Sequence, residues 1–387
     1  MQIYLDYSAT TPPHPDAIAL MHRVMTSQWG NPSSLHQWGV QAATCVEQAR
    51  ISVASLINAP IDTIVFTSGG TEADNFAILG TARRYPTPRH LIISSVEHSA
   101  IAEPARALEQ QGWRVTRLPV SAQGRVAPED LEAALRPDTV LVSVIYGQSE
   151  VGTLQPIHEL GTVARRHGAL FHTDAVQVAG RLPLDVQQLP VDMLSLSSHK
   201  LYGPQGAGAL YIHPGVPLSP LLRGGGQERG LRSGTQATPA IAGFGAAAAL
   251  ASDGLTAESE RLRRLRDRLL QQLQSEPRLR LTGDPVHRLP HHLSFYLSHG
   301  DGIQLSGKTI VRQMNLAGIG ISAGSACHSG KLSPSPILKA MGYSDRAAKC
   351  GIRLSLGRHT TEADVDWVAL TVRQVLDRCP APALSPV

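Results

Sequence analysis

The sequence predicts an α/β protein with a mostly parallel, seven-stranded sheet in a large domain and a smaller α+β domain. Short runs rich in Val, Ile and Leu follow one another through the middle of the chain, as in strands buried on both faces. Helical patterns lie between several of these runs, and such alternation is typical of layered α/β folds. The pattern changes after residue 255, and 387 residues are enough for a second core.

The expected strands are seven apolar runs, which lie at Thr63–Thr67, His90–Ser95, Arg114–Pro119, Thr139–Tyr146, Leu170–Thr173, Met193–Ser197 and Ala209–His213. Helices are predicted at Val40–Ile57, Glu72–Arg84, Pro128–Leu135 and Pro156–His167. The second helix follows a Gly-Gly-Thr entry, the third has an acidic first turn, and the fourth ends at a glycine. These are ordinary signals of helix ends.

A long amphipathic helix is predicted after residue 255 from four leucines at helical spacing, Leu262, Leu265, Leu269 and Leu273. It would carry the chain from a large domain, residues 14–257, into a small domain, residues 258–387, on which residues 1–13 pack. A last helix is expected from about Thr361 to Arg378, because Thr361 and Asp364 have the spacing of a capping box.

The charge and composition exclude several classes of protein. Lys and Arg number 35 against 31 Asp and Glu, and no dense basic run with interleaved aromatics suggests nucleic acid as a partner. The first residues do not resemble a secretory signal, and no apolar run reaches the roughly 18 residues of a membrane span. The four cysteines have no CxxC spacing, which favours reduced thiols in a cytoplasmic protein, and we assign no metal ligands.

Three features at expected strand ends suit a ligand, although each also has a purely structural interpretation. Ser68–Thr71 turns a strand into a helix, where free N–H groups bind phosphate, but tight turns use glycine anyway. Asp174 either meets a ligand or caps a helix. Lys200 is either a desolvated amine able to form a Schiff base or a surface lysine. Together they are the three groups that a protein needs to bind pyridoxal phosphate at its phosphate, its ring nitrogen and its aldehyde carbon.

A fourth feature is Cys327, which lies in a run of small and polar residues with glycines on both sides. Structural cysteines are usually buried among large apolar residues, whereas a thiol in a loop is accessible and can act as a nucleophile. For Cys45, Cys350 and Cys379 a packing or incidental role is the better interpretation.

These residues resemble those of the cysteine desulfurases, which are pyridoxal-phosphate enzymes of fold type I. The matching runs extend over nearly the whole chain and read YLDYSATTP from Tyr4, GNPSS from Gly30, VEH from Val96, SHKLYGP from Ser198, GGGQERGLRSGT from Gly224 and IRLSLGR from Ile352. The resemblance implies the fold-type-I transferase fold and the removal of sulfur from L-cysteine to give L-alanine. It also implies an enzyme persulfide that serves the synthesis of iron–sulfur clusters or other sulfur compounds.

The resemblance further implies a role for each site residue. The catalytic residues would be Lys200, which forms the Schiff base and moves a proton, Cys327, which accepts the sulfur, and His98, which stacks on the ring. The cofactor would also be held by Asp174 at the ring nitrogen, Gln177 at the phenolic oxygen, and the phosphate ligands Gly70, Thr71, Ser197 and His199, joined by Thr235 from the other subunit of a homodimer. The substrate would be bound by Arg353 at its carboxylate, and by Gln148 and Asn31.

The sequence departs from the family pattern at Gln148-Ser149, where relatives usually have Asn-Asn. Gln148 keeps the amide but adds a methylene, which affects substrate placement. Either His98 or His328 could deprotonate the thiol, and an exposed loop histidine is the preferred interpretation of His328. A sulfur-acceptor protein is expected, with an iron–sulfur scaffold as one candidate. Alternatives are a related lyase or aminotransferase, a selenocysteine lyase, and a catalytically weakened relative that only binds partners.

Overall fold

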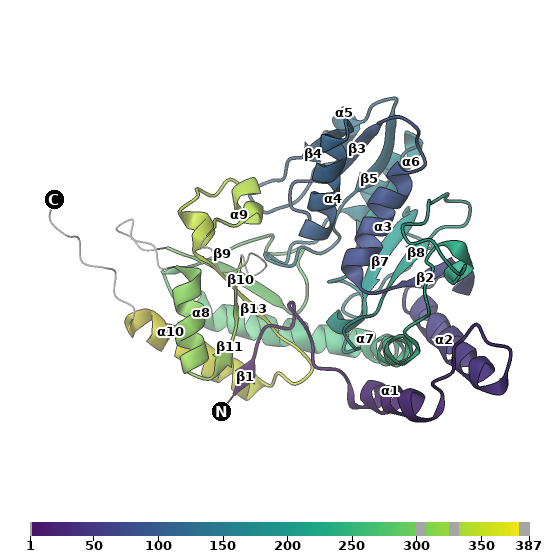
Figure 1. Cartoon of the computed structure of the whole chain (residues 1–387). Helices are drawn as coiled ribbons and strands as arrows, with labels where there is room; N and C mark the ends of the chain where they lie inside the picture. Colours follow the sequence, from purple (N-terminus) through teal and green to yellow (C-terminus); the bar gives the residue numbers. More distant parts are fainter. Residues whose placement is uncertain (1, 299–305, 325–332, 379–387) are drawn as a thin grey trace.

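The large sheet of the computed structural model, which describes residues 2–298, 306–324 and 333–378, forms from the seven apolar runs of the sequence (Figure 1). Its strands are β2 (Ile64–Thr67), β3 (His90–Ser94), β4 (Arg114–Leu118), β5 (Thr139–Ser143), β6 (Leu170–Asp174), β7 (Met193–Ser197) and β8 (Gly208–Ile212). They lie in the order β2-β8-β7-β6-β5-β3-β4, and β8 runs antiparallel to both of its neighbours while the remaining pairs are parallel. The predicted mostly parallel sheet is confirmed.

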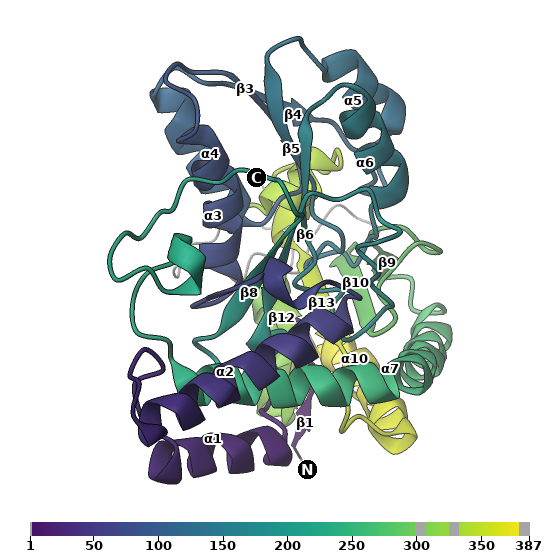
Figure 2. The same cartoon turned by 90° about the vertical axis from the view of Figure 1, so that its right-hand side faces the viewer.

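Helices cover both faces of this sheet, which explains why most of its strands are buried along their whole length (Figure 2). The edge strand β4 is the exception, since Arg114 and Arg117 are exposed. In β3, Leu91 and Ile93 pack in the core under α3 (Gly70–Ala82) and α4 (Ser99–Gln110). Ile92 points the other way, because successive strand residues face opposite sides. The core on that side includes residues of α2 (Gln37–Leu56), α5 (Pro128–Ala134) and α6 (Ile157–Arg166).

The helix α7 (Thr238–Leu273) is 36 residues long and begins before the predicted leucine pattern. Its first half packs against α1 (Pro15–Ser27) and α2, and its glycines permit the close approach. A Cβ at Gly245 would collide with the backbone and side chain of Ala49. By length and composition α7 is the one helix in the described part of the chain that could cross a membrane, because an 18-residue stretch of it has a mean hydropathy of 1.3. Its packing against two helices accounts for that apolar character.

The second half of α7 belongs to a separate core. Its four predicted leucines pack with α8 (Gly307–Leu316), α10 (Glu362–Arg378) and an antiparallel sheet of order β12-β13-β10-β9. The strands of that sheet are β9 (Leu279–Leu281), β10 (His292–Leu297), β12 (Ser322–Ala323) and β13 (Gly351–Ser355). The short strand β1 (Ile3–Tyr4) pairs with β11 (Ile319–Gly320), which brings the N-terminal segment to this core.

The change from one core to the other takes place inside a continuous helix, and the boundary at residue 257 stays a prediction.

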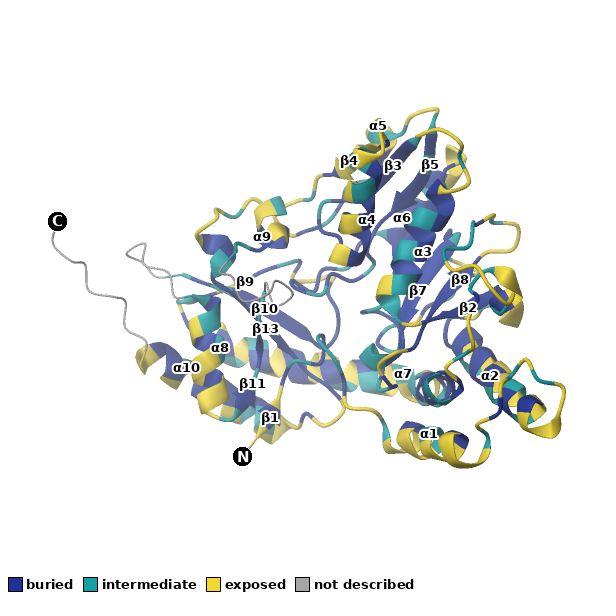
Figure 3. Cartoon of the chain, in the orientation of Figure 1, coloured by how far each residue is buried: buried dark blue, intermediate teal, exposed yellow. Residues whose placement is uncertain are grey.

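The capping box at the start of α10 is present: Asp364 Oδ2 accepts from the Thr361 N–H at 2.9 Å, and Thr361 Oγ1 accepts from the Asp364 N–H at 3.1 Å. The central strands of both sheets are buried, whereas the edge strand β4 and much of α1 are exposed (Figure 3). A short helix, α9 (Pro336–Ala340), lies between β12 and β13 in the sequence.

Candidate active site

Two charged side chains lie at the carboxyl ends of neighbouring parallel strands. Asp174 ends β6 and pairs with Ser195 of β7, and the turn after β7 carries Lys200. Asp174 is buried, and its Oδ1 accepts from the Val176 N–H at 2.9 Å. Burial raises the pKa of Asp174, while positive charge on His98 and Lys200 acts in the opposite direction. The strand ends therefore bring a carboxylate, an amine and an imidazole within electrostatic reach of one another.

The N-terminal segment covers this group of side chains. Lys200 Nζ donates to the carbonyl oxygens of Ser8, at 2.7 Å, and Ala9, at 2.6 Å. Gln177 Nε2 donates to the Ser8 oxygen at 2.9 Å. The segment is far from both side chains in the sequence, so spacing alone gives no sign of this contact.

The N-terminus of α3 lies beside the end of β7. The helix begins at Gly70, and the N-cap residue Gly69 has a φ of 154° and supplies no side-chain cap. A Cβ at Gly70 would lie 2.9 Å from Val176 Cγ2 and 3.4 Å from Ser197 Cβ, so glycine allows the helix start to approach the strand end. The partial positive charge at this end, with Thr71 in the first turn, suits an anionic group such as a phosphate.

His199 lies in the same turn as Lys200 and contacts the N-terminal segment. Its Nδ1 is 3.1 Å from Thr10 Oγ1, and its carbonyl oxygen accepts from the Thr11 N–H at 3.0 Å. Burial, helped by the charge of Lys200, lowers the pKa of His199 to about 4. The imidazole is therefore neutral at pH 7 and acts as a hydrogen-bonding group rather than a cation.

His98 is the N-cap residue of α4. Its Nδ1 accepts from the Ala100 N–H at 3.1 Å, which orients the ring and leaves the proton of the neutral imidazole on Nε2. The preceding Glu97 is buried, and its Oε1 accepts from Ser94 Oγ at 2.5 Å and from the Ile145 N–H at 2.9 Å. Burial raises the pKa of Glu97 to about 8, so this carboxyl group is mostly protonated at pH 7.

Two further buried groups lie near Asp174 and were missed in the sequence. Asp74 of α3 is 3.8 Å from His172 Nε2, measured from its Oδ1. The His172 ring nitrogens contact Ser143 Oγ and Ser195 Oγ, each at 2.9 Å. Burial and the charge of Asp174 raise the pKa of Asp74, and burial lowers the pKa of His172 to about 3. A carboxylate on the apolar face of a helix is the sequence signal that could have identified Asp74.

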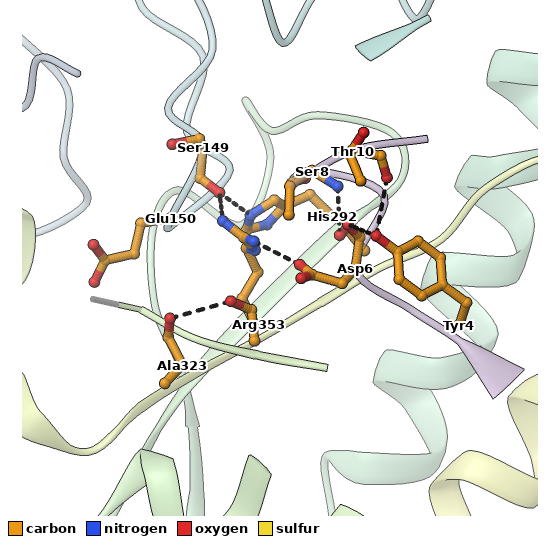
Figure 4. Close-up of polar contacts among 12 residues, drawn as sticks. Tyr4, Asp6, Ser8, Thr10, Ser149, Glu150, His292, Ala323 and Arg353 are labelled. Atoms are coloured by element: carbon orange, nitrogen blue, oxygen red, sulfur yellow. Dashed lines mark hydrogen bonds and ion pairs between the residues drawn. The ribbon is translucent and has the colours of Figure 1, made fainter. Parts of the chain in front are cut away.

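Arg353 lies on β13 and forms hydrogen bonds with the N-terminal segment and with the loop that holds Ser149 (Figure 4). Its Nη2 donates to Asp6 Oδ1 at 2.6 Å, and its Nη1 donates to the Ser149 carbonyl oxygen at 3.0 Å. His292 Nε2 donates to the same carbonyl at 3.0 Å. Arg353 is only 6% exposed, and its Nε has no hydrogen-bond partner among the described residues. Two partners thus orient the guanidinium, and further N–H donors are left for a ligand.

The Gln148 side chain folds back onto its own loop. Its Oε1 accepts from the N–H groups of Glu150, at 2.5 Å, and Val151, at 3.0 Å, and its Nε2 donates to the Val96 carbonyl at 3.3 Å. The residue is 2% exposed. The Gln148 amide therefore binds backbone groups of the protein itself, and its contact with substrate stays a prediction.

Two expected site residues do not contact this group of side chains within the single chain. Asn31 is exposed, and its Oδ1 accepts from the Ser33 N–H at 2.9 Å, which stabilises its own turn before α2. Thr235 is exposed in the segment before α7. In the described part of the chain, no hydrogen bond joins either residue to Lys200 or Asp174, and their roles stay predictions.

The two described cysteines have the features of packing residues. Cys350 is 3% exposed, its Sγ donates to the Arg346 carbonyl at 3.3 Å, and burial raises its pKa to about 11. Cys45 Sγ lies 3.2 Å from Gln28 Oε1, and burial raises its pKa too. Neither thiol readily forms a thiolate at pH 7. Three predicted positions lie outside the described residues, namely Cys327, His328 and Cys379.

The strand that leads toward Cys327 is described. β12 pairs with β13, where Ser322 lies opposite Arg353. Gly324 follows, and a Cβ there would collide with Glu150 Oε1, so only glycine fits without a shift. The described chain therefore reaches Gly324, three positions before Cys327 in the sequence, close to the strand that carries Arg353.

Comparison with known proteins finds relatives along nearly the whole chain. The profile of the aminotransferase class-V family matches residues 3–368. The chain is 44% identical over 382 residues to the cysteine desulfurase IscS of Methylococcus capsulatus, and the alignment covers 98% of this chain and 93% of that protein. It is 44% identical over 380 residues to the mitochondrial cysteine desulfurase of Saccharomyces cerevisiae, which covers 97% of this chain and 74% of that protein.

The fold also has a counterpart among solved structures. A NifS-like protein superposes with a TM-score of 0.90 at 33% sequence identity. The match covers 98% of this chain and 100% of that one, so it includes both cores and the helix between them.

Proposed function

The chain belongs to the aminotransferase class-V family and is a cysteine desulfurase that uses pyridoxal phosphate, and on this premise we propose which residues carry the reaction. The enzyme takes sulfur from L-cysteine and leaves L-alanine and a protein persulfide. One observation carries the proposal: the N-terminal segment binds Arg353 through Asp6 and Lys200 through Ser8 and Ala9. A carboxylate-binding group and a reactive amine are thereby held on the same short segment.

The described residues fit the cofactor. The buried Asp174 carboxylate suits a protonated pyridine nitrogen, and the Lys200 amine suits the aldehyde carbon. The N-terminus of α3 at Gly70 suits the phosphate. When bound, the cofactor withdraws electrons from the α-carbon of the substrate. The further ligands that we propose are Thr71, Ser197 and His199 at the phosphate, and His98 and Gln177 at the ring.

We propose that Arg353, Lys200 and Cys327 bind the substrate, transfer its proton and accept its sulfur, respectively. Arg353 binds the carboxylate of L-cysteine with the N–H donors that Asp6 and Ser149 leave unused. Lys200 moves the proton at the substrate α-carbon. The Cys327 thiolate attacks the substrate sulfur, and the S–S bond forms as the Cβ–S bond breaks. The bonding pair stays on Cβ, which takes up a proton to become the methyl group of L-alanine.

A homodimer would complete the site with Thr235 of a second subunit. An apolar surface on α1, α2 and the segment between them supports this proposal, with the exposed side chains Met25, Trp29, Leu35, Trp38, Val40 and Ile51. Leu35 is 98% exposed, and it lines one hollow together with Val40 and Ile51. Large exposed apolar side chains that line a common hollow, as Leu35, Val40 and Ile51 do, are typical of protein interfaces.

The persulfide must pass its sulfur to an acceptor, and we propose a sulfur-acceptor protein, for which an iron–sulfur scaffold is one class. We also propose the cytoplasm as the place of action, on the composition of the chain. The relative from S. cerevisiae is named as mitochondrial, so the family is not confined to one compartment.

Product analysis tests the function. The purified protein, supplied with pyridoxal phosphate, L-cysteine and a thiol reductant, should release sulfide and L-alanine in equal amounts. Sulfide accompanied by pyruvate and ammonia in place of L-alanine would identify a β-elimination lyase instead.

A further inference from the structure

Asp6 is held in place by backbone and side-chain contacts at the end of β13. It forms a parallel bridge with Ser355, and the Ser8 N–H donates to Ser355 Oγ at 2.9 Å. Tyr4 Oη donates to the carbonyl oxygens of Asp6 and Thr10, each at 3.0 Å (Figure 4). The Asp6 carboxylate is therefore not a loose surface group.

The contact between Asp6 and Arg353 leaves N–H donors of the guanidinium for a second carboxylate. It joins one oxygen, Oδ1, to one amino group, Nη2, and the two side chains are 21% and 7% exposed. Nη1 is oriented by the Ser149 carbonyl. A guanidinium has five N–H donors, so these two contacts orient the group without exhausting it.

We propose that Asp6 is a positioning residue for Arg353, and that it favours substrates with an α-carboxylate over amines that have none. The inference rests on the proposed role of Arg353. Arginine has a long side chain that loses rotamer freedom when it binds, and a side chain ordered beforehand binds a ligand with a smaller entropic cost. The segment that carries Asp6 also holds the Lys200 amine, so it sets the spacing between the groups that receive the substrate carboxylate and amine.

Two ligands that differ by one carboxylate test the proposal. L-Alanine has the carboxylate and ethylamine does not, and the absorbance of the bound cofactor reports the binding of both. In Asp6→Ala we expect the dissociation constant of L-alanine to rise about tenfold while that of ethylamine changes less than about twofold. Asp6→Asn keeps an acceptor at Oδ1 and should recover part of the loss. The KM of L-cysteine should rise with little change in kcat.

Asp253→Asn, an exposed carboxylate on α7, is the matched control and should change neither dissociation constant. Thermal unfolding of each variant without cofactor shows whether it is folded. Equal weakening of both ligands in folded Asp6→Ala, or tighter binding of L-alanine, would overturn the positioning role. A wild-type protein that makes no L-alanine from L-cysteine would overturn the proposed function itself, which is a separate result.

Discussion

Lys200 and Gln177 donate hydrogen bonds to the same atom, the carbonyl oxygen of Ser8, at 2.7 and 2.9 Å. One peptide carbonyl thus orients two side chains that follow different strands. The Lys200 amine donates to Ala9 as well, so it points into the candidate site rather than to solvent. This position suits an amine that must meet an aldehyde.

The lysine can be tested directly. Lys200→Ala removes the amine, and we expect pyridoxal phosphate to bind only non-covalently, because no other group at these strand ends can form the Schiff base. Borohydride reduction followed by mass spectrometry should find the cofactor attached to the wild-type protein and not to the variant. Cofactor fixed to the variant would show that a different lysine is the anchor.

Two of the three glycines of α7, Gly245 and Gly254, should respond to substitution in opposite directions. A Cβ at Gly245 collides with Ala49, so Gly245→Ala should lower the free energy of unfolding by about 1–3 kcal/mol through overpacking. Gly254 has open space around it, and Gly254→Ala should raise that free energy by about 0.5–1 kcal/mol. Urea unfolding measures both. A loss of stability in both variants would contradict the described packing of α7.

Glu97 should make stability depend on pH. The pKa of Glu97 is about 8 in the folded protein, against an ordinary value of 4.5. The protonated Glu97 side chain therefore contributes its full stabilisation of the fold below pH 4.5, and this contribution is lost as the pH rises through 8. Glu97→Gln keeps a neutral group at the same place and should lack this loss. Between pH 5 and 8, the free energy of unfolding of the variant, measured in urea, should therefore rise relative to that of the wild type. The expected rise is up to about 1.4 kcal/mol for each pH unit.

The control for Glu97 is Glu103→Gln on the same part of the chain, because the Glu103 side chain is 59% exposed. It should show no comparable trend with pH. A difference between Glu97→Gln and wild type that stays constant from pH 5 to 8 would mean that Glu97 is ionised in the fold.

The strands and the strand-end residues are the part of this structure that local patterns can predict. Ile92 and its neighbours are apolar because both faces of β3 are buried, and this is visible in the sequence. Asp174 and Lys200 follow such runs, and parallel strands end at the same edge of a sheet. The capping box at Thr361 is similarly local.

Contacts between distant segments could not be predicted in this way. Asp6 and Arg353 are separated by 347 positions, and no periodicity links them. The start of α7 could not be predicted because Gly243 and Gly245 weaken the helical pattern. Glycine is needed at these two positions because α1 and α2 pack closely against them. Glu97 looks like an ordinary charged residue until its burial is known.

The apolar surface of α1 and α2 predicts a two-chain particle. Leu35→Glu places a charge at its most exposed side chain, which should shift the protein toward monomer in sedimentation velocity and lower desulfurase activity in parallel. Val286→Glu is the matched control, since Val286 is 76% exposed but lies in the segment between β9 and β10, outside α1 and α2. A Leu35→Glu variant that remains fully dimeric would exclude this surface as the interface.

The central claim is that Cys327 receives the sulfur, and Cys327→Ser tests it most directly. A hydroxyl has a far higher pKa than a thiol and is a poor sulfur acceptor at pH 7. The variant should bind pyridoxal phosphate and L-cysteine as before, because Lys200, Asp174 and Arg353 are intact. Cys45→Ser and Cys350→Ser, which alter packing thiols, should retain turnover apart from any loss of stability.

The deciding measurement is the rate of sulfide release from L-cysteine by Cys327→Ser, with the protein persulfide followed by mass spectrometry. We predict that the persulfide disappears and that sulfide and L-alanine production falls with it. Sulfide release by the variant at the wild-type rate would contradict the account and leave direct β-elimination as the mechanism.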